Sequence, residues 1–469
     1  MKVVLIFPNG FLGKAFRLDI PMHPPLTLAS LGAVLRQHDH EVVLIDAMVE
    51  NLSSSRLASR VAAIDPRVIG ITGNVATASS ALGTARSLRE HLGDGTSILF
   101  GGPWATAEHE RVLLDGFADV VVMGEGEETI IELLESIDDR KAWGSIRGIA
   151  FKEGGAVVKT AQRPLIESLD ALPFPAWDLL PPSSRYFFYT RGYPLYPVMT
   201  SRGCPYNCVH CTKLVFGHRY RVRSPESVLL EFEYLKREHG VKTVAIVDDT
   251  FTNDPERAER ILDGLISRRL GISIMFSNGV RADTITTRLA RKFKAAGVFY
   301  VGLGIESGNQ HIVNQIGKKL DLLRVIRAAR ALRREGIITC GYYIFGHPQD
   351  DASSMWQTVR FALSLDTDYV QFFKAVPIAG TEMHRTIEEH GRFLRERHGW
   401  NTDGYNIASA SFEIWNVRAR DVERVFKTSY RLYYLSPRRL LRMVYRYRTI
   451  TEFKWFVKSI IQIFVKNLA

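Results

Sequence analysis

Short β-rich runs alternate with amphipathic segments along most of this chain. In its first part the β-rich runs are VVLIF (3–7), EVVLIDA (41–47), VIGITG (68–73), SILFGGP (97–103) and VVVMGEGE (120–127). Segments with helical periodicity, such as LTLASLGAVLRQ and ETIIELLESI, lie between them. This alternation predicts parallel strands joined by crossover helices. We therefore expect residues 1–138 to form a doubly wound α/β sheet of the flavodoxin or Rossmann type, whose ligands bind beyond the carboxyl ends of the strands.

A second series of the same kind follows. Its expected strands are PVMTSRG (197–203), TVAIVDD (243–249), SIMFSNG (273–279), FYVGLGIE (299–306), CGYYIFG (340–346) and YVQFFKAV (369–376). Six such units predict a partial (β/α)6 barrel over residues 196–400, with its chemistry at the C-terminal ends of the strands. Residues 139–195 are expected to connect the two domains through a β-hairpin on the Gly154-Gly155 turn and a proline-rich linker.

The remaining residues, 401–469, are predicted to form a helical region rich in basic and aromatic side chains. From Arg418 onward there are 13 basic and 3 acidic residues, which is almost the whole of the net charge of +11. The rest of the chain is nearly neutral, so no nucleic-acid partner is expected. A helix over residues 453–468 places Phe453 and Phe456 on one face. Such a helix either lies in an anionic membrane interface or caps the barrel with a solvated basic face.

The composition does not indicate export or a membrane span. No run of about 18 apolar residues is present, and the N-terminus lacks the apolar region and cleavage site of a signal peptide. Three of the four cysteines lie within eight positions, which indicates a metal site in a reducing compartment. The fourth, Cys340, lies in a hydrophobic strand and is expected in the core. We expect a cytoplasmic protein, with peripheral contact at the inner face of the membrane if the C-terminal helix binds lipid.

The clustered cysteines, Cys204, Cys208 and Cys211, form a CxxxCxxC motif after the first predicted barrel strand. Thiolates are ligands for zinc and for iron–sulfur clusters. A structural zinc needs a fourth ligand, which His210 or His218 would have to supply. A [4Fe–4S] cluster held by three cysteines instead keeps one iron open for an external ligand.

Polar residues and a glycine follow the next four predicted barrel strands. They are Asp248, Asp249, Asn278, Arg281, Glu306, Ser307 and Gly346. The carboxyl ends of parallel strands meet at one edge, so these residues are expected to surround the cysteine motif. Structural roles stay open for three of them, because the two aspartates could be helix N-caps and the arginine could form a surface ion pair.

A CxxxCxxC motif after the first strand of a six-unit βα barrel resembles the radical S-adenosylmethionine (SAM) superfamily. The resemblance implies a [4Fe–4S] cluster whose open iron chelates SAM, and whose electron cleaves SAM to methionine and a 5′-deoxyadenosyl radical. His210 stands where that family commonly has an aromatic residue, and its ring could stack on the adenine. The implied SAM contacts are His210, Asp248, Asp249, Asn278, Arg281, Glu306, Ser307 and Gly346.

The N-terminal domain resembles that of the cobalamin (B12)-binding radical SAM enzymes, a class that includes Mg-protoporphyrin IX monomethyl ester cyclases and class B methyltransferases. The stretches HPPLTLASLGAVLR, GGPWAT, GEGEETIIELL and ALPFPAWD match the class in order and spacing. Cobalamin would lie between the sheet edge and the barrel mouth. The loop PNGFLGKAF has no axial histidine, which agrees with this class and also with a domain that has lost cobalamin. The implied cobalamin contacts are Asn9, Thr72, Gly73, Gly101, Gly102, Pro103, Gly124, Glu125 and Gly126.

The resemblance implies an enzyme that methylates an unactivated carbon of a lipid or secondary metabolite. It would use SAM both as methyl donor and as radical source, and would need an external one-electron reductant of the flavodoxin or ferredoxin type. Two other radical reactions stay open: an oxidative cyclisation or rearrangement, and chemistry without cobalamin. An iron–sulfur electron carrier or a zinc-stabilised binding protein is the alternative from a different class.

Overall fold

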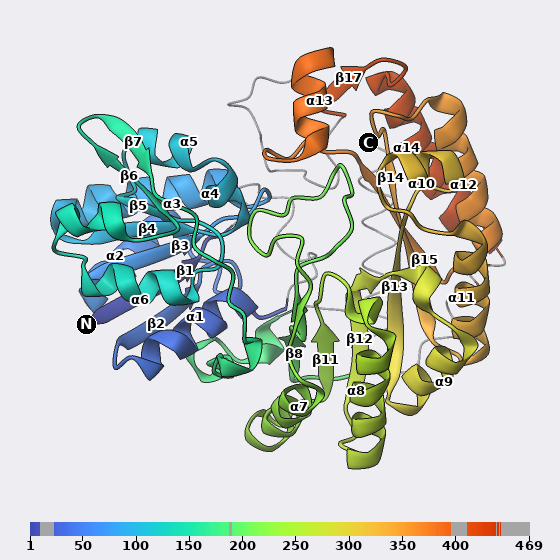
Figure 1. The fold of residues 1–469 in the computed structure, drawn as a ribbon, viewed down its shortest axis with the longest axis horizontal. Coiled ribbons are helices and arrows are strands. Elements are labelled where there is room, and N and C mark those ends of the chain that lie inside the picture. Colours follow the sequence, from blue (N-terminus) through green and yellow to red (C-terminus); the bar gives the residue numbers. More distant parts are fainter. Residues whose placement is uncertain (10–22, 187–189, 395–409, 438, 440, 442–469) are drawn as a thin grey trace.

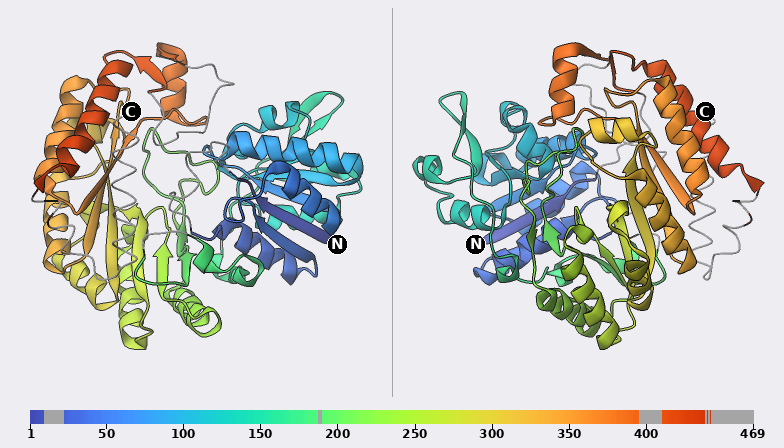
Figure 2. Two further views of the ribbon diagram at one scale, coloured as in Figure 1. Left: turned by 180° about the vertical axis from the view of Figure 1, so that it is seen from behind. Right: turned by 45° about the vertical axis from the view of Figure 1, so that its right-hand side comes forward.

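The computed structural model describes residues 1–9, 23–186, 190–394, 410–437, 439 and 441. Two α/β halves stand side by side, and the chain near residue 200, drawn in green, runs between them (Figure 1). Figure 2 shows the same division from behind and from the right-hand side. The predicted succession of a doubly wound sheet and a partial barrel is confirmed.

The N-terminal half is built on one sheet with the strand order β2-β1-β3-β4-β5-β6-β7. Strands β1 to β5 are parallel and have the order of flavodoxin-type sheets. The strands are β1 (Lys2–Phe7), β2 (Glu41–Asp46), β3 (Val68–Thr72), β4 (Ser97–Gly101), β5 (Val120–Val122), β6 (Ile149–Glu153) and β7 (Ala156–Lys159).

Helices cover both faces of this sheet. Val3 and Leu5 of β1 belong to one core cluster, whereas Val4 and Ile6 belong to the other, as the two-residue alternation of a strand requires. The helices of this half are α1 (Leu26–Gln37), α2 (Ser54–Ile64), α3 (Ala78–Leu92), α4 (Pro103–Ala107), α5 (His109–Leu114) and α6 (Glu127–Glu135). Residues of α1 and α6 pack on the first face, and residues of α2 to α5 pack on the second.

The predicted hairpin belongs to this sheet rather than to the linker. Strands β6 and β7 pair antiparallel, and Gly154 and Gly155 form the turn with φ of +57° and +86°, the left-handed values that a tight hairpin needs. Strand β6 also pairs antiparallel with β5, so that Val122 lies opposite Ile149. The sheet therefore continues past residue 138, where the sequence placed the end of the domain, as far as Lys159.

The C-terminal half is an open parallel barrel of six strands in the order β15-β14-β13-β12-β11-β8. Each strand pairs with its sequence neighbour in this series, as expected for successive βα units. The strands are β8 (Leu195–Val198), β11 (Thr243–Ile246), β12 (Ser273–Val280), β13 (Val298–Glu306), β14 (Ile338–Phe345) and β15 (Tyr369–Lys374). A separate two-stranded ladder, β9 (Ser201–Arg202) with β10 (Arg221–Val222), follows β8.

Helices cover the outside of the barrel (Figure 1). Several begin at side chains that accept a backbone hydrogen bond, including Asp254 before α8 and Asp351 before α12, as helix N-caps do. The helices are α7 (Pro225–His239), α8 (Pro255–Arg268), α9 (Thr287–Ala295), α10 (Gln310–Gln315), α11 (Leu322–Arg334), α12 (Ala352–Leu365), α13 (Glu382–His390) and α14 (Ala419–Tyr434). Asp248 and Asp249 cap none of the described helices.

Helix α14 covers the open edge of the barrel at β15. The Tyr434 hydroxyl accepts from the Val370 amide at 3.0 Å and donates to the Val370 carbonyl at 2.7 Å. Tyr430, one helical turn earlier, bonds both backbone groups of Phe372 in the same way. Two tyrosines four residues apart on the helix thus bond two strand residues that are two apart. The backbone groups of this edge strand are therefore satisfied without another strand.

The two halves share a continuous hydrophobic core. Trp177 of the linker is buried and its ring lies 5.1 Å from the ring of Tyr196 in the first barrel strand. The linker also bonds to the N-terminal half, because the Ala176 amide donates to the Ala29 carbonyl of α1 at 2.9 Å. These contacts set the position of the sheet edge relative to the barrel.

The C-terminal region is helical only in part among the described residues. Residues 412–414 form a strand, β17 (Phe412–Ile414), that pairs antiparallel with β16 (Gly391–Phe393) across the boundary expected at residue 400. The predicted amphipathic helix at 453–468 lies outside the described residues. No described helix is long and apolar enough to cross a membrane.

Removal of the Tyr434 hydroxyl should destabilise the protein. In Tyr434→Phe the buried amide and carbonyl of Val370 lose their partner, so the free energy of unfolding should fall by about 1–3 kcal/mol. Denaturant titration would measure the loss. Lys427→Gln, at an exposed position of the same helix, should leave the stability unchanged. Equal stability of Tyr434→Phe and the parent protein would contradict this role of α14.

Candidate functional site

The three clustered cysteines lie on a loop of residues 203–220 that leaves β9 and returns at β10. Gly203, the first residue of this loop, has a φ of +82°, and a side chain there would meet the Arg219 carbonyl oxygen at 2.2 Å. The loop is held from outside by two backbone bonds, from the Val209 amide to the Ile316 carbonyl and from the Met383 amide to the Val209 carbonyl. A fixed backbone therefore presents the thiols.

All three thiols line one cavity of about 400 Å³ at the C-terminal ends of the barrel strands. We call it the cysteine cavity. Burial raises the pKa of the Cys208 thiol to about 11, and metal binding replaces such a proton. The cavity wall also includes five other residues that the sequence singled out. They are His210, Asp249, Asn278, Arg281 and Glu306.

Glu306 is turned into the cysteine cavity by an irregularity in its strand. The register of β13 against β14 shifts between Gly304 and Glu306, and Glu306 has a φ of +68°, which a residue with a side chain rarely adopts. Its carboxylate accepts from Lys318 Nζ at 2.6 Å. Burial alone would lower the pKa of Lys318, but Glu306 and Cys208 together raise it. Lys318 also lines the cavity, and the sequence analysis missed it.

Arg281 and Asn278 line the cavity with side chains that already have protein partners. The Arg281 guanidinium pairs with Asp283 at 2.9 Å and lies 3.8 Å from the centre of the Tyr206 ring. It also donates to the Lys318 carbonyl at 2.7 Å. The Asn278 amide donates to the Val247 carbonyl at 2.8 Å. Both side chains are therefore held in fixed orientations at the cavity wall.

His210 presents an imidazole to the cavity. Its ring lies 5.1 Å from that of His347, and burial lowers the pKa of each histidine to about 3, so both rings are neutral. The buried Nδ1 atom of His210 has no hydrogen-bond partner among the described residues. An unsatisfied ring nitrogen in a cavity wall fits a polar ligand.

Three of the expected SAM contacts do not line this cavity. Asp248 is buried and accepts hydrogen bonds at 2.6 Å from the amide and hydroxyl of Thr200 and from the Ser201 hydroxyl. Ser307 is buried against Thr358, with 3.0 Å between their hydroxyl oxygens. The Gly346 amide donates to Asp350. Asp248 thus links the ends of two strands, Ser307 is bonded to helix α12, and Gly346 is bonded within its own loop.

Cys340 is a core residue, as expected. It is 1% exposed within β14 and hydrogen-bonds with Tyr300. It does not line the cysteine cavity.

A second cavity, of about 410 Å³, lies between the N-terminal sheet edge and the cysteine loop. We call it the interdomain cavity. The glycine-rich ends of β3, β4 and β5 form one wall, while linker residues such as Phe174 and loop residues such as Phe216 form others. Seven of the expected cobalamin contacts line it: Thr72, Gly101, Gly102, Pro103, Gly124, Glu125 and Gly126.

Asn9 and Gly73 do not line the interdomain cavity. The Asn9 amide donates to the Leu52 carbonyl at 3.2 Å. Gly73 joins the ends of two strands, because its amide donates to the Gly101 carbonyl and its carbonyl accepts from Trp104. Both residues instead shape the loops around the sheet edge.

The interdomain cavity reaches inward between the sheet and α1. Leu5, Gly70 and Leu99 line this inner part, together with Leu28 and Leu31 of α1. A side chain at Gly70 would meet the Leu5 side chain at 2.6 Å, so the glycine adds to the space beside Leu5. An apolar recess below a glycine-rich strand edge fits a large cofactor with an extended substituent.

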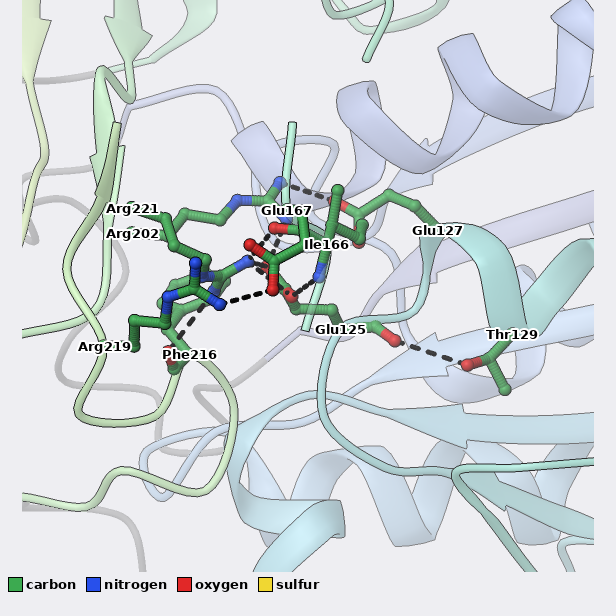
Figure 3. A network of polar contacts seen from close by, with 9 residues as sticks. All are labelled: Glu125, Glu127, Thr129, Ile166, Glu167, Arg202, Phe216, Arg219 and Arg221. Atoms are coloured by element: carbon green, nitrogen blue, oxygen red, sulfur yellow. Dashed lines mark hydrogen bonds and ion pairs between the residues drawn. The ribbon is translucent and has the colours of Figure 1, made fainter. Parts of the chain in front are cut away.

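The wall between the interdomain cavity and the cysteine loop contains a buried ion network (Figure 3). Glu125 and Glu127, which follow β5, face Arg202 and Arg221 of the two-stranded ladder. The sequence placed Glu125 at a cobalamin site but gave no sign of its arginine partners.

The two cavities adjoin. Lys213 and Asp249 line both of them. The sequence analysis did not select Lys213. Its position two residues after Cys211 could have indicated it, because a cation there would lie beside the three thiolates. Burial alone would lower the pKa of Lys213, but the cysteines and Asp249 raise it. A molecule at this boundary would contact the contents of both cavities.

Comparison with known proteins agrees with this architecture. Residues 21–134 match the B12 binding domain, and residues 198–362 match the Radical SAM superfamily. The chain is 31% identical, over 95% of its own length and 95% of the other, to an uncharacterised methyltransferase of Pyrococcus horikoshii. It is 26% identical, over 89% of this chain and 83% of the other, to the anaerobic magnesium-protoporphyrin IX monomethyl ester cyclase of a Synechocystis species.

A solved structure has the same fold. It is the radical SAM methyltransferase TsrM from Kitasatospora setae, with cobalamin and a [4Fe–4S] cluster bound, at a TM-score of 0.68 and 20% identity. The match covers 83% of this chain and 74% of TsrM.

The fold and the matches define an enzyme with a B12-binding domain in front of a radical SAM domain. The chain belongs to the cobalamin-dependent radical SAM methyltransferase family. Its cofactors are therefore a [4Fe–4S] cluster, SAM and cobalamin. The alternatives of a zinc site, an electron carrier and a radical enzyme without cobalamin are set aside.

Glu306 lines the cysteine cavity and its neighbour Ser307 does not, and measurements of SAM binding can test this difference. Glu306→Gln should weaken SAM binding to the cluster-loaded protein by roughly ten- to a hundredfold, because hydrogen bonds to a charged group contribute about 1.5–3 kcal/mol. Ser307→Ala, at the adjacent position, should bind SAM like the parent. Equilibrium dialysis with labelled SAM would measure both constants. Equal weakening in the two variants would contradict the prediction that Glu306, and not Ser307, contacts SAM.

Proposed function

We propose that this enzyme methylates an unactivated carbon of a lipid or another largely apolar metabolite. The observation that carries the proposal is the contact between the two cavities at Lys213 and Asp249. A carbon that is first activated at one cofactor and then methylated at the other must reach both, and this boundary is where a substrate could do so. The family relatives named as methyltransferases support the same reaction class.

We assign the three clustered cysteines to the cluster and the other residues of the cysteine cavity to SAM. Glu306 and His210 would contact SAM directly, whereas Lys318 and Arg281 would set the charge of the wall. The residues of the interdomain cavity would hold cobalamin. When bound, the cluster supplies the electron that cleaves SAM, and cobalamin carries the methyl group. An external one-electron reductant of the flavodoxin or ferredoxin type would supply the electrons.

The apolar part of the substrate would lie against the barrel strands opposite the cysteine loop. Tyr342 and Ile344 of β14, with Phe373 of β15, line that side of the cysteine cavity. The Tyr342 hydroxyl already donates to the Ser277 carbonyl at 2.7 Å, so the ring is held and presents mainly carbon atoms. Such a surface favours an apolar substrate by burial of nonpolar area.

The proposed reaction predicts two products from SAM. Anaerobically reconstituted protein, supplied with cobalamin, a reductant, methyl-labelled SAM and a lipid extract of the native host, should form 5′-deoxyadenosine and S-adenosylhomocysteine and should label an extractable lipid. Cys208→Ala should still bind cobalamin but form no 5′-deoxyadenosine. Formation of 5′-deoxyadenosine without methyl transfer would favour the cyclase-type alternative. Absence of both products from protein with an intact cluster would overturn the proposal.

The basic C-terminal segment would bring the enzyme to the surface of a membrane that contains such a lipid. Its positive charge and aromatic residues favour binding to anionic headgroups. Full-length protein should therefore co-sediment with vesicles of anionic phospholipid more than with neutral vesicles. Deletion of residues 449–469 should abolish the difference. Unchanged sedimentation after the deletion would remove the membrane contact from the proposal.

A further inference from the structure

One carboxylate group accepts hydrogen bonds from two arginines, one at each end of the cysteine loop. Arg202, just before the loop, donates to Glu125 Oε1 at 2.7 Å, and Arg221, just after it, donates to Glu125 Oε2 at 2.9 Å (Figure 3). The two arginines lie directly opposite each other in the β9–β10 ladder. Glu125 therefore holds together the base of the loop that carries Cys204, Cys208 and Cys211.

The network is buried and its formal charges balance. Arg202 also donates to Glu127 Oε1 at 2.5 Å, which gives two carboxylates for two guanidinium groups. The four side chains are exposed by 10% or less. Interactions between buried charges are strong and directional, and removal of one partner leaves an uncompensated charge. The loop is thus attached to the N-terminal half in one orientation.

The same network reaches the part of the loop that follows the cysteines. Arg221 donates to the Phe216 carbonyl at 3.3 Å, and the Arg202 guanidinium lies 5.2 Å from the centre of the Phe216 ring. Phe216 lines the interdomain cavity. The network therefore contacts both ends of the cysteine loop and its returning segment.

Glu125 is also part of the wall of the interdomain cavity, in the turn between β5 and α6. A second bond holds its carboxylate from the linker side, because the Ile166 amide donates to Glu125 Oε2 at 2.9 Å. A ligand in the interdomain cavity would pack against this turn and limit its movement. The ligand would therefore help to hold the Glu125 carboxylate in place, and this carboxylate sets the spacing of the two arginines.

We propose that Glu125 is a positioning residue that couples cobalamin binding to the geometry of the cysteine loop. This inference rests on the proposed function, since it takes cobalamin as the ligand of the interdomain cavity. Cobalamin holds the Gly124–Glu127 turn, the turn holds Arg202 and Arg221, and the arginines hold the loop in its cluster-binding form. Coupling between two binding sites is reciprocal, so the cluster must strengthen cobalamin binding by the same factor.

The test compares the affinity for hydroxocobalamin in the presence and absence of the cluster. Full-length protein is used with its cluster and after anaerobic removal of the cluster by a chelator, and the dissociation constants are taken from absorbance titrations. For the parent we expect binding about tenfold tighter when the cluster is present. In Glu125→Gln, which keeps the size of the side chain but removes its charge, the ratio should approach one. Iron content and circular dichroism report whether that variant keeps its cluster and its fold.

Two further variants make the result interpretable. Glu128 follows Glu127 in the first turn of α6, but its side chain is 57% exposed and lies outside the network. Glu128→Gln should therefore keep the parent ratio. Glu127→Gln removes the charge of one of the two carboxylate partners of Arg202 and leaves Glu125 in place, so it should give an intermediate ratio. It replaces Glu125→Gln if that variant does not fold.

The outcomes separate this inference from the proposed function. If the parent does not bind hydroxocobalamin, the proposed function itself fails. If the parent binds it with the same affinity in both states, or if folded Glu125→Gln keeps the parent ratio, the coupling is wrong although cobalamin binding stands.

Discussion

The pairing of Glu125 and Glu127 with Arg202 and Arg221 is the interaction on which the relation between the two cavities depends. The hydrophobic core joins the halves over a wide area, but burial of apolar surface has no direction and tolerates small rotations. Charge-assisted hydrogen bonds fix both distance and angle. Because both arginines flank the cysteine loop, the same contacts set the place of the thiols relative to the glycine-rich edge of the sheet. These four side chains therefore add a directional constraint to the relative position of the two cavities, which the core and the linker contacts alone would leave looser.

Outside this network, most polar side chains of the site are also held by other protein groups. Arg281 is fixed by Asp283 and Tyr206, and Glu306 by Lys318. A site of this kind needs little rearrangement when a ligand binds, so less binding energy is lost in ordering side chains. Lys213 and Asp249 line both cavities, so their side chains can contact the contents of either one.

Local patterns in the sequence predicted both folds and the cysteine motif, because strand alternation, helix periodicity and cysteine spacing each depend on nearby residues. They could not decide which of two neighbouring residues faces a cavity. Asp248 turns into the barrel wall while Asp249 lines the cavity, and a strand irregularity turns Glu306 inward while Ser307 stays buried. The arginine partners of Glu125 lie 77 and 96 residues away in the chain, a separation that no local pattern reports. The hairpin was predicted, but its pairing with β5 depends on the whole sheet.

The tyrosine contacts of α14 have a consequence for how the protein is made. Synthesis proceeds from the N-terminus, so β15 leaves the ribosome well before Tyr430 and Tyr434 do. Until then the backbone groups of Val370 and Phe372 have no partner from α14 and offer an edge to which another strand can add. The nascent barrel therefore keeps an unprotected strand edge until α14 has been translated, and a chain that ends between these segments would be prone to aggregation through that edge.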